Sequence, residues 1–231
     1  MEWLRITAQL YLRAYSRGVQ LAARNWPVLF TVLVYSTLLD LGARFAAPFG
    51  MLGGFATSLL LAACISSCLS LVETILRTTK VTLEDFRSSF GAYLYDVVGV
   101  IFVSWVFFFF VTPILRQTPN GALLLVCVNI AVFVFFNAVP ELIYLGRHTV
   151  MQLLGESYRF IADNWIEWFP VTFFFLVAYI GLALLPPTVP SLLHSALLGA
   201  LLYLALIVRG LLFIELHGSS RRGRAFRYRA R

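Results

Sequence analysis

The chain has 231 residues, of which 60% are apolar and only 13% are charged, and its formal net charge is +7. Soluble domains carry about 25% charged residues, so this composition excludes a protein whose surface faces mainly water. Basic charge on so apolar a chain favours anionic lipid headgroups as a partner, and the absence of a basic soluble module argues against nucleic-acid binding.

The N-terminal residues 2–24 predict an amphipathic helix that lies on the membrane surface. At about 100° per residue, the polar side chains fall within an arc of roughly 120°, and aromatic and aliphatic residues occupy the rest. Arginines interrupt the apolar face too often for a signal peptide. We expect four arginines of the polar arc to contact lipid headgroups: Arg5, Arg13, Arg17 and Arg24.

Two apolar segments, about 26–46 and 50–76, follow this helix. Each reaches the roughly 20 residues needed to cross a hydrocarbon core, and in lipid only a helix satisfies the backbone of such a segment. Near the end of the second, Glu73 precedes Arg77 by four residues, the order that favours an ion pair on a helix. Cys64 and Cys68 are expected to be packing residues.

A second unit repeats this layout. Residues 82–94 predict another surface helix, which begins with a capping box formed by Thr82 and Asp85. Two further apolar segments follow, about 95–115 and 121–145.

The second of these segments carries polar groups at membrane depth. Asn137 and Glu141 share a helix face, and Pro140 between them removes a backbone donor. The freed carbonyl oxygens and the two side chains could bind a cation or a polar substrate, or they could hold helices together.

The third unit consists of a surface helix at 149–164 and apolar segments at about 166–187 and 191–216. Arg209 lies about seven residues inside the end of the last segment, which is roughly 10 Å at 1.5 Å per residue. A charge at this depth is a candidate functional group. Arg209 could pair with Glu73 or Glu141, bind a lipid phosphate, or extend to the interface.

The distribution of basic residues predicts the orientation. The connections outside the three tight turns hold most of them: four in 1–25, three in 77–94, two in 146–165 and six in 217–231. The turns hold only Arg44 and Arg116. The positive-inside rule therefore predicts that both termini are cytoplasmic, and the last residues, 219–231, form a basic tail whose Arg221, Arg222 and Arg224 contact anionic lipid.

The three units resemble one another in sequence. A shift of 67 residues aligns Thr82 with Thr149, and a shift of 139 aligns Asn25-Trp26 with Asn164-Trp165. We predict one polytopic domain, 1–218, built from parallel repeats at about 1–78, 79–146 and 147–218. The fold class is thus all-α integral membrane, with six transmembrane helices as three hairpins, each preceded by an interfacial helix.

This layout, with Lys-Val-Thr-Leu-Glu-Asp-Phe at 80–86 ahead of Phe-Gly-Ala-Tyr-Leu at 90–94, resembles uncharacterised bacterial six-helix membrane families. These are the YciC-like proteins and the membrane domain attached to some glycerophosphodiester phosphodiesterases. The resemblance implies the six-helix fold and brings no catalytic residues, and the soluble phosphodiesterase barrel has no counterpart in this chain.

No catalytic constellation is visible in the sequence. His148 and His217 lie near Glu141 and Glu215, but no tight carboxylate–histidine spacing indicates a metal site. A serine-hydrolase elbow and a nucleotide-binding P-loop are also missing. We expect no metal and no cofactor, and an enzyme is the least favoured class.

Two functions follow from these patterns. The first is a non-enzymatic protein of the bacterial inner membrane that organises lipid or a membrane complex. The alternative is a transporter or a permease subunit driven by a separate ATPase, in which Glu73, Asn137, Glu141 and Arg209 line a central polar path. Convergence of these four on an open cavity favours transport, whereas separate closed pairs favour the first function.

Overall fold

The computed structural model describes residues 2–146, 149–185 and 190–218. Within these ranges every regular element is a helix, and none is a strand. Five segments are long and apolar enough to cross a membrane: Trp26–Thr78, Leu94–Arg116, Gly121–Leu145, Val150–Ala183 and Leu192–His217. The prediction of an all-α protein with the apolar segments of a multi-pass membrane protein is confirmed at this level.

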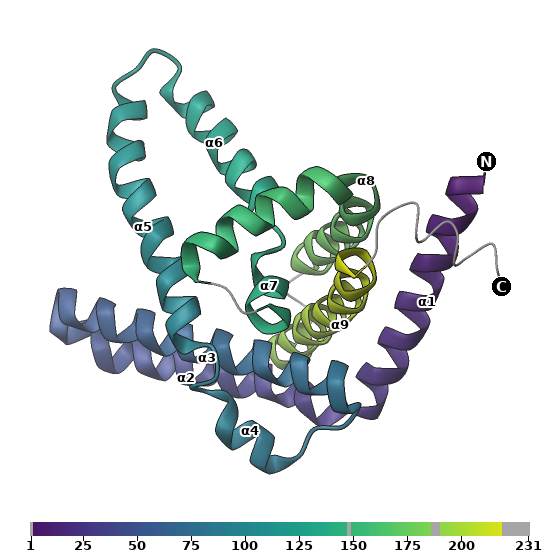
Figure 1. The fold of residues 1–231 in the computed structure, drawn as a ribbon. Helices are drawn as coiled ribbons and strands as arrows, with labels where there is room; N and C mark the ends of the chain where they lie inside the picture. Colours follow the sequence, from purple (N-terminus) through teal and green to yellow (C-terminus); the bar gives the residue numbers. More distant parts are fainter. Residues whose placement is uncertain (1, 147–148, 186–189, 219–231) are drawn as a thin grey trace.

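Helix α1 (Glu2–Arg24) covers the protein rather than standing apart from it. Leu10, Ala14 and Leu21 on its apolar face are buried, and Gly18 lies against Val208 of the last helix. The apolar face predicted to meet the acyl region thus packs largely on protein, because α1 and α9 (Ser191–His217) lie side by side (Figure 1).

The first long apolar segment folds back on itself. A 3-10 turn, η1 (Trp26–Val28), leads into α2 (Leu29–Ala46), and a second one, η2 (Ala47–Phe49), separates α2 from α3 (Gly50–Thr78). Gly53 allows the close approach at this turn, since a Cβ there would lie 1.9 Å from the Ala46 carbonyl oxygen. Helices α2 and α3 therefore pack along each other (Figure 1).

The second unit begins with the short helix α4 (Leu83–Ser89) and continues with α5 (Leu94–Arg116). The predicted capping box is present, because Thr82 and Asp85 each hydrogen-bond the backbone N–H of the other. Hydrogen bonds from the Thr82 side chain and backbone hold the pKa of Asp85 below its ordinary value, so the box is lost only as the pH falls through that lowered pKa.

The fourth predicted segment is interrupted. It forms α6 (Gly121–Phe135) and α7 (Val139–Leu145), with the break just before Pro140. The Val139 N–H donates to the Phe136 carbonyl instead of the Phe135 carbonyl, which it would reach in a continuous α-helix. The Phe135 carbonyl accepts a hydrogen bond from the Ser157 hydroxyl of α8 at 2.8 Å instead. The break thus gives neighbouring helices a polar attachment point.

The third unit differs from the prediction in one respect. The surface helix expected at 149–164 and the apolar segment after it form one continuous helix, α8 (Val150–Ala183), which begins with the predicted capping box of Thr149 and Gln152. After α1 the chain leaves α-helical geometry at Asn25, and Pro27 lies in the 3-10 turn η1, whereas Pro170 falls inside α8. Figure 1 shows α8 changing direction along its length, which a proline inside a helix explains.

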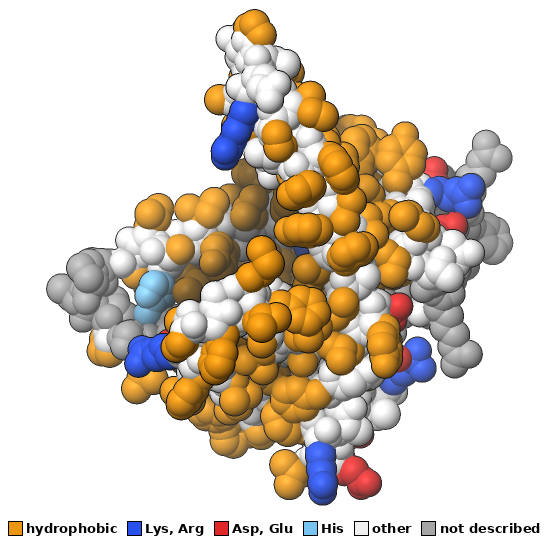
Figure 2. Space-filling model, turned by 90° about the vertical axis from the view of Figure 1, so that its left-hand side faces the viewer, with side chains coloured by type: hydrophobic (Ala, Val, Ile, Leu, Met, Phe, Trp, Pro, Cys, Tyr) orange, Lys and Arg blue, Asp and Glu red, His pale blue; other side chains and the backbone are white. Residues whose placement is uncertain are grey.

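The core lies where α3, α7, α8 and α9 meet. Most of the buried residues come from the last turns of α3, from α7, from α8 between Leu153 and Phe175, and from the second half of α9. From this core the pair α2–α3 and the pair α5–α6 extend in different directions (Figure 1). Apolar side chains cover most of the face in Figure 2. Helices α5 and α6 expose many large apolar side chains, including Phe102, Trp105, Phe110 and Ile130.

The docking of α1 on α9 depends on the missing side chain at position 18. A Cβ there would lie 2.5 Å from Val208 Cγ2, so we expect Gly18→Leu to push α1 away and lower the free energy of unfolding by about 1–3 kcal/mol. Denaturation in mixed micelles, together with protease sensitivity of α1, measures this effect. The matched control is Gly54→Leu, where nothing lies within 4 Å of a Cβ. Equal effects of the two substitutions would contradict tight docking of α1.

Candidate functional site

Arg209 and Glu141 form a buried ion pair at the centre of the molecule. Arg209 Nε and Nη2 donate to the two carboxylate oxygens of Glu141 at 2.8 and 3.0 Å, and Nη2 also donates to the Asn137 carbonyl at 2.6 Å. The Glu141 side chain is 0% exposed and that of Arg209 is 15% exposed. A guanidinium bound through two nitrogens is fixed in orientation as well as in charge, so this is a rigid pair.

Trp168 of α8 closes the cluster from the third unit. Its indole Nε1 donates to Asn137 Oδ1 at 2.8 Å, and its ring faces the Arg209 guanidinium carbon at 4.9 Å from the ring centroid. The Thr172 hydroxyl donates to the same amide oxygen at 3.4 Å. Together these contacts join α7, α8 and the α6–α7 break to α9, and the Trp168 indole gives the Asn137 amide oxygen its short hydrogen bond.

Glu73 does not belong to this cluster. It forms the predicted ion pair with Arg77 at 2.8 Å, and it accepts a hydrogen bond from the Tyr93 hydroxyl. Because Tyr93 immediately precedes α5, this contact ties α3 to the start of the second unit. Of the two partners proposed for Arg209, the structure therefore selects Glu141 and leaves Glu73 in a separate pair.

Three of the four candidate polar-path residues, Asn137, Glu141 and Arg209, thus contact one another rather than an open cavity. None of them lines any of three cavities found in the described part of the chain, which are a groove between α1 and α9, an apolar crevice among α2, α3, α5, α7 and α9, and a pocket at the α2–α3 turn. The carbonyls next to the helix break are occupied by protein donors. The arrangement connects helices. This fits the interpretation that the polar groups around Pro140 hold helices together, rather than the one in which they bind a cation or a polar substrate.

Two buried residues of α8 that the sequence analysis did not single out are Trp168 and Glu167. Trp168 is 0% exposed, and Glu167 beside it is buried as well. A signal for Trp168 exists in the sequence, because Asn164, Trp168 and Thr172 follow at intervals of four and share a helix face. Glu167 would emerge from a search for carboxylates inside the apolar segments.

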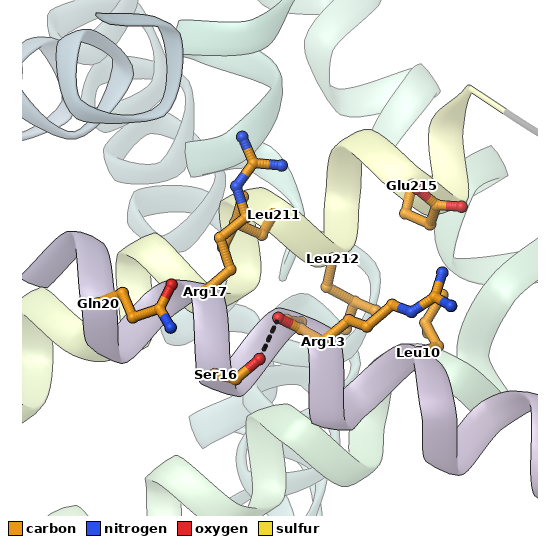
Figure 3. Close-up of a pocket in the computed structure, with 9 residues that line it drawn as sticks. Leu10, Arg13, Ser16, Arg17, Gln20, Leu211, Leu212 and Glu215 are labelled. Carbon is orange, nitrogen blue, oxygen red and sulfur yellow. Dashed lines mark hydrogen bonds between the residues drawn. The ribbon is translucent and has the colours of Figure 1, made fainter. Parts of the chain in front are cut away.

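The basic face of α1 borders a groove of about 500 Å³. From α1 it is lined by Leu10, Arg13, Ala14, Ser16, Arg17 and Gln20, and from α9 by Leu211, Leu212 and Glu215 (Figure 3). Figure 3 shows the side chains of Arg13 and Arg17 extending toward α9. Two of the four predicted lipid-contact arginines of α1 therefore share one concave surface.

The other predicted lipid contacts are placed differently or are not described. Arg5 and Arg24 are exposed on α1 but do not line the groove. Arg221, Arg222 and Arg224 lie outside the described residues. Tyr11, also on α1, donates to the Glu167 carbonyl at 2.9 Å, and burial raises the pKa of Tyr11 to about 12, so this hydroxyl remains protonated and can donate throughout the physiological range.

The described residues contain no group of three or more His, Cys, Asp or Glu side chains that could hold a metal ion. His217 stacks on Phe213 with ring centroids 5.1 Å apart. His148, the other histidine considered for a metal, lies outside the described residues. The three cysteines are free thiols.

No protein-family model matches this chain, and neither a curated protein nor a solved structure matches it. The resemblance in layout to the bacterial six-helix families therefore stays a prediction.

Proposed function

We propose that this chain is a non-enzymatic, multi-pass protein of the bacterial inner membrane that organises anionic phospholipid or a membrane complex. The observation that carries the proposal is a contrast between two sets of charges. The charges at membrane depth, Arg209 and Glu141, are bound to each other, and neither lines any of the three cavities described above. Two arginines of α1, Arg13 and Arg17, are by contrast exposed and line an open groove.

The proposed topology has six crossings with both termini in the cytoplasm. The 53-residue segment Trp26–Thr78 supplies two of them, because η2 turns the chain and α2 packs along α3. The remaining four are α5, α6 with α7, the second half of α8, and α9. Since the helix pairs diverge from the core in Figure 1, we expect tilted crossings for all six to share one bilayer.

Matching contacts in different units support the proposed threefold repeat. Asn25 and Asn164 each donate from Nδ2 to the carbonyl four residues earlier, at 2.9 and 3.1 Å. The Ser89 hydroxyl hydrogen-bonds the Ser67 hydroxyl, and the Ser157 hydroxyl donates to the Phe135 carbonyl. A shift of 68 residues relates the two contacts, because it takes Ser89 to Ser157 and Ser67 to Phe135. In both cases the surface part of one unit is bonded to the second spanning helix of the unit before it.

The test of this function is gentle extraction of the full chain at its native expression level, followed by mass spectrometry of what co-purifies. We expect anionic phospholipid at a fixed ratio to protein, with or without a cell-envelope assembly. A stoichiometric ATPase or solute-binding protein would overturn the proposal in favour of a permease subunit. Extraction free of anionic lipid and of protein partners would also contradict it.

A further inference from the structure

The groove between α1 and α9 has a polar edge and an apolar floor. The polar lining residues of α1 share one helix face, since three of them follow Arg13 by three, four and seven residues: Ser16, Arg17 and Gln20. Leu10, Ala14 and Leu212 beneath them are buried. This pairing of cationic and hydrogen-bonding groups with an apolar surface matches a molecule that is anionic at one end and apolar at the other.

On the proposed topology, the α9 wall of the groove lies near the cytoplasmic end of a membrane-spanning helix. The three residues of α9 that line it, Leu211, Leu212 and Glu215, belong to the last two turns of the apolar segment that ends at His217. Leu211 is six residues from that end, which is roughly 9 Å at 1.5 Å per residue. Arginine side chains that reach across α9 at this level meet the boundary between acyl chains and headgroups.

The electrostatics favour an anion near Arg17. Arg77, Arg159 and Arg209 all form ion pairs with carboxylates, but the Arg17 guanidinium has neither a carboxylate partner nor a hydrogen bond among the described residues. Figure 3 shows Glu215 on the side of the groove toward Arg13, away from Gln20. A phosphate is therefore best accommodated at the Arg17 and Gln20 end, farther from that carboxylate.

We propose that this groove binds one anionic phospholipid, with its phosphodiester between Arg17 and Gln20, Arg13 beside it, and its glycerol and acyl region against the partly exposed Leu211. The proposal rests on the lipid-organising function above and deepens it, because it replaces a diffuse basic face with a single site. The site is composite, since α1 supplies the charges and α9, nearly two hundred residues later, supplies the opposite wall.

The test uses the full chain in detergent and native mass spectrometry with three added probes: phosphatidylglycerol, phosphatidylcholine and inorganic phosphate. We expect saturable binding of one phosphatidylglycerol and weaker binding of phosphatidylcholine. Arg17→Gln removes a charged hydrogen-bonding group and should weaken phosphatidylglycerol binding about tenfold. Arg24→Gln, an equal change of charge on the same helix outside the groove, should change it less than about twofold.

A second pair of variants changes shape without changing charge. Leu211→Trp should fill the groove and weaken binding, whereas Ile214→Trp, at an exposed position of α9, should not. Equal losses from Arg17→Gln and Arg24→Gln would overturn the site and leave the lipid-organising function standing. Binding of inorganic phosphate that competes with the lipid would overturn the lipid as occupant. Failure of the unmodified chain to bind phosphatidylglycerol would contradict both proposals.

Discussion

Replacing Glu141 with alanine is expected to destabilise the protein by about 3–5 kcal/mol, the typical cost of removing one partner from a buried ion pair. The reason is the position of Arg209, whose side chain is only 15% exposed and whose Nε and Nη2 both bind this carboxylate. Without Glu141 the guanidinium keeps a single protein acceptor, the Asn137 carbonyl. Resistance to unfolding in mixed detergent micelles measures the loss.

The control for this prediction removes both charges. Glu141→Leu combined with Arg209→Met leaves no unpaired ion and should be far more stable than Glu141→Ala, within about 1–2 kcal/mol of the original protein. Glu141→Gln keeps an oxygen acceptor and should fall between them. A double variant as unstable as the single one would show that packing, rather than the ion pair, accounts for the loss.

Replacing Trp168 with alanine is the second change with a large expected effect. The side chain is 0% exposed and packs on Phe160 with ring centroids 5.1 Å apart, and it bonds Asn137 and faces Arg209. Buried Trp→Ala changes in water-soluble cores cost about 3–5 kcal/mol. Within lipid the water-transfer part of that cost falls away, so we expect about 2–3 kcal/mol from the cavity and the lost contacts.

Trp165→Ala is the matched control, because Trp165 lies on the same helix and is 55% exposed. It should change the free energy of unfolding by no more than about 0.5 kcal/mol. Trp168→Phe should fall between the two, since it keeps an aromatic ring and removes the N–H donor to Asn137. The same micelle denaturation distinguishes them, and similar losses at positions 165 and 168 would contradict the central role of the cluster.

The sequence predicted the local features of this chain well because they depend on neighbours along one helix. The capping boxes at Thr82 and Thr149 involve residues three apart, and the ion pair from Glu73 to Arg77 spans four. The long apolar segments were equally visible, since the length of a span is set by the bilayer. The loss of a backbone donor at Pro140 was predicted, but the division of this apolar segment into α6 and α7 was not.

Contacts between distant residues could not be predicted in the same way. Arg209 had two equally placed carboxylates, and only the packing of α9 against α7 brought Glu141 to it, while Tyr93 and Arg77 occupied Glu73. Trp168 entered the cluster because α8 continues past Asn164 without a break. Periodicity defines which face of a helix is apolar, but it does not say which helix will meet that face.

The sequence by itself therefore determined the all-α class, the apolar segments, the capped helix starts at Thr82 and Thr149, and the basic face of α1. Only the tertiary structure decided that the deep charges close on one another and that Arg13 and Arg17 share a groove with α9. The physical reason is range. Hydrogen bonds and side-chain pairs within a helix are fixed by a spacing of three or four residues, whereas a site built from α1 and α9 exists only after the whole chain between them has folded.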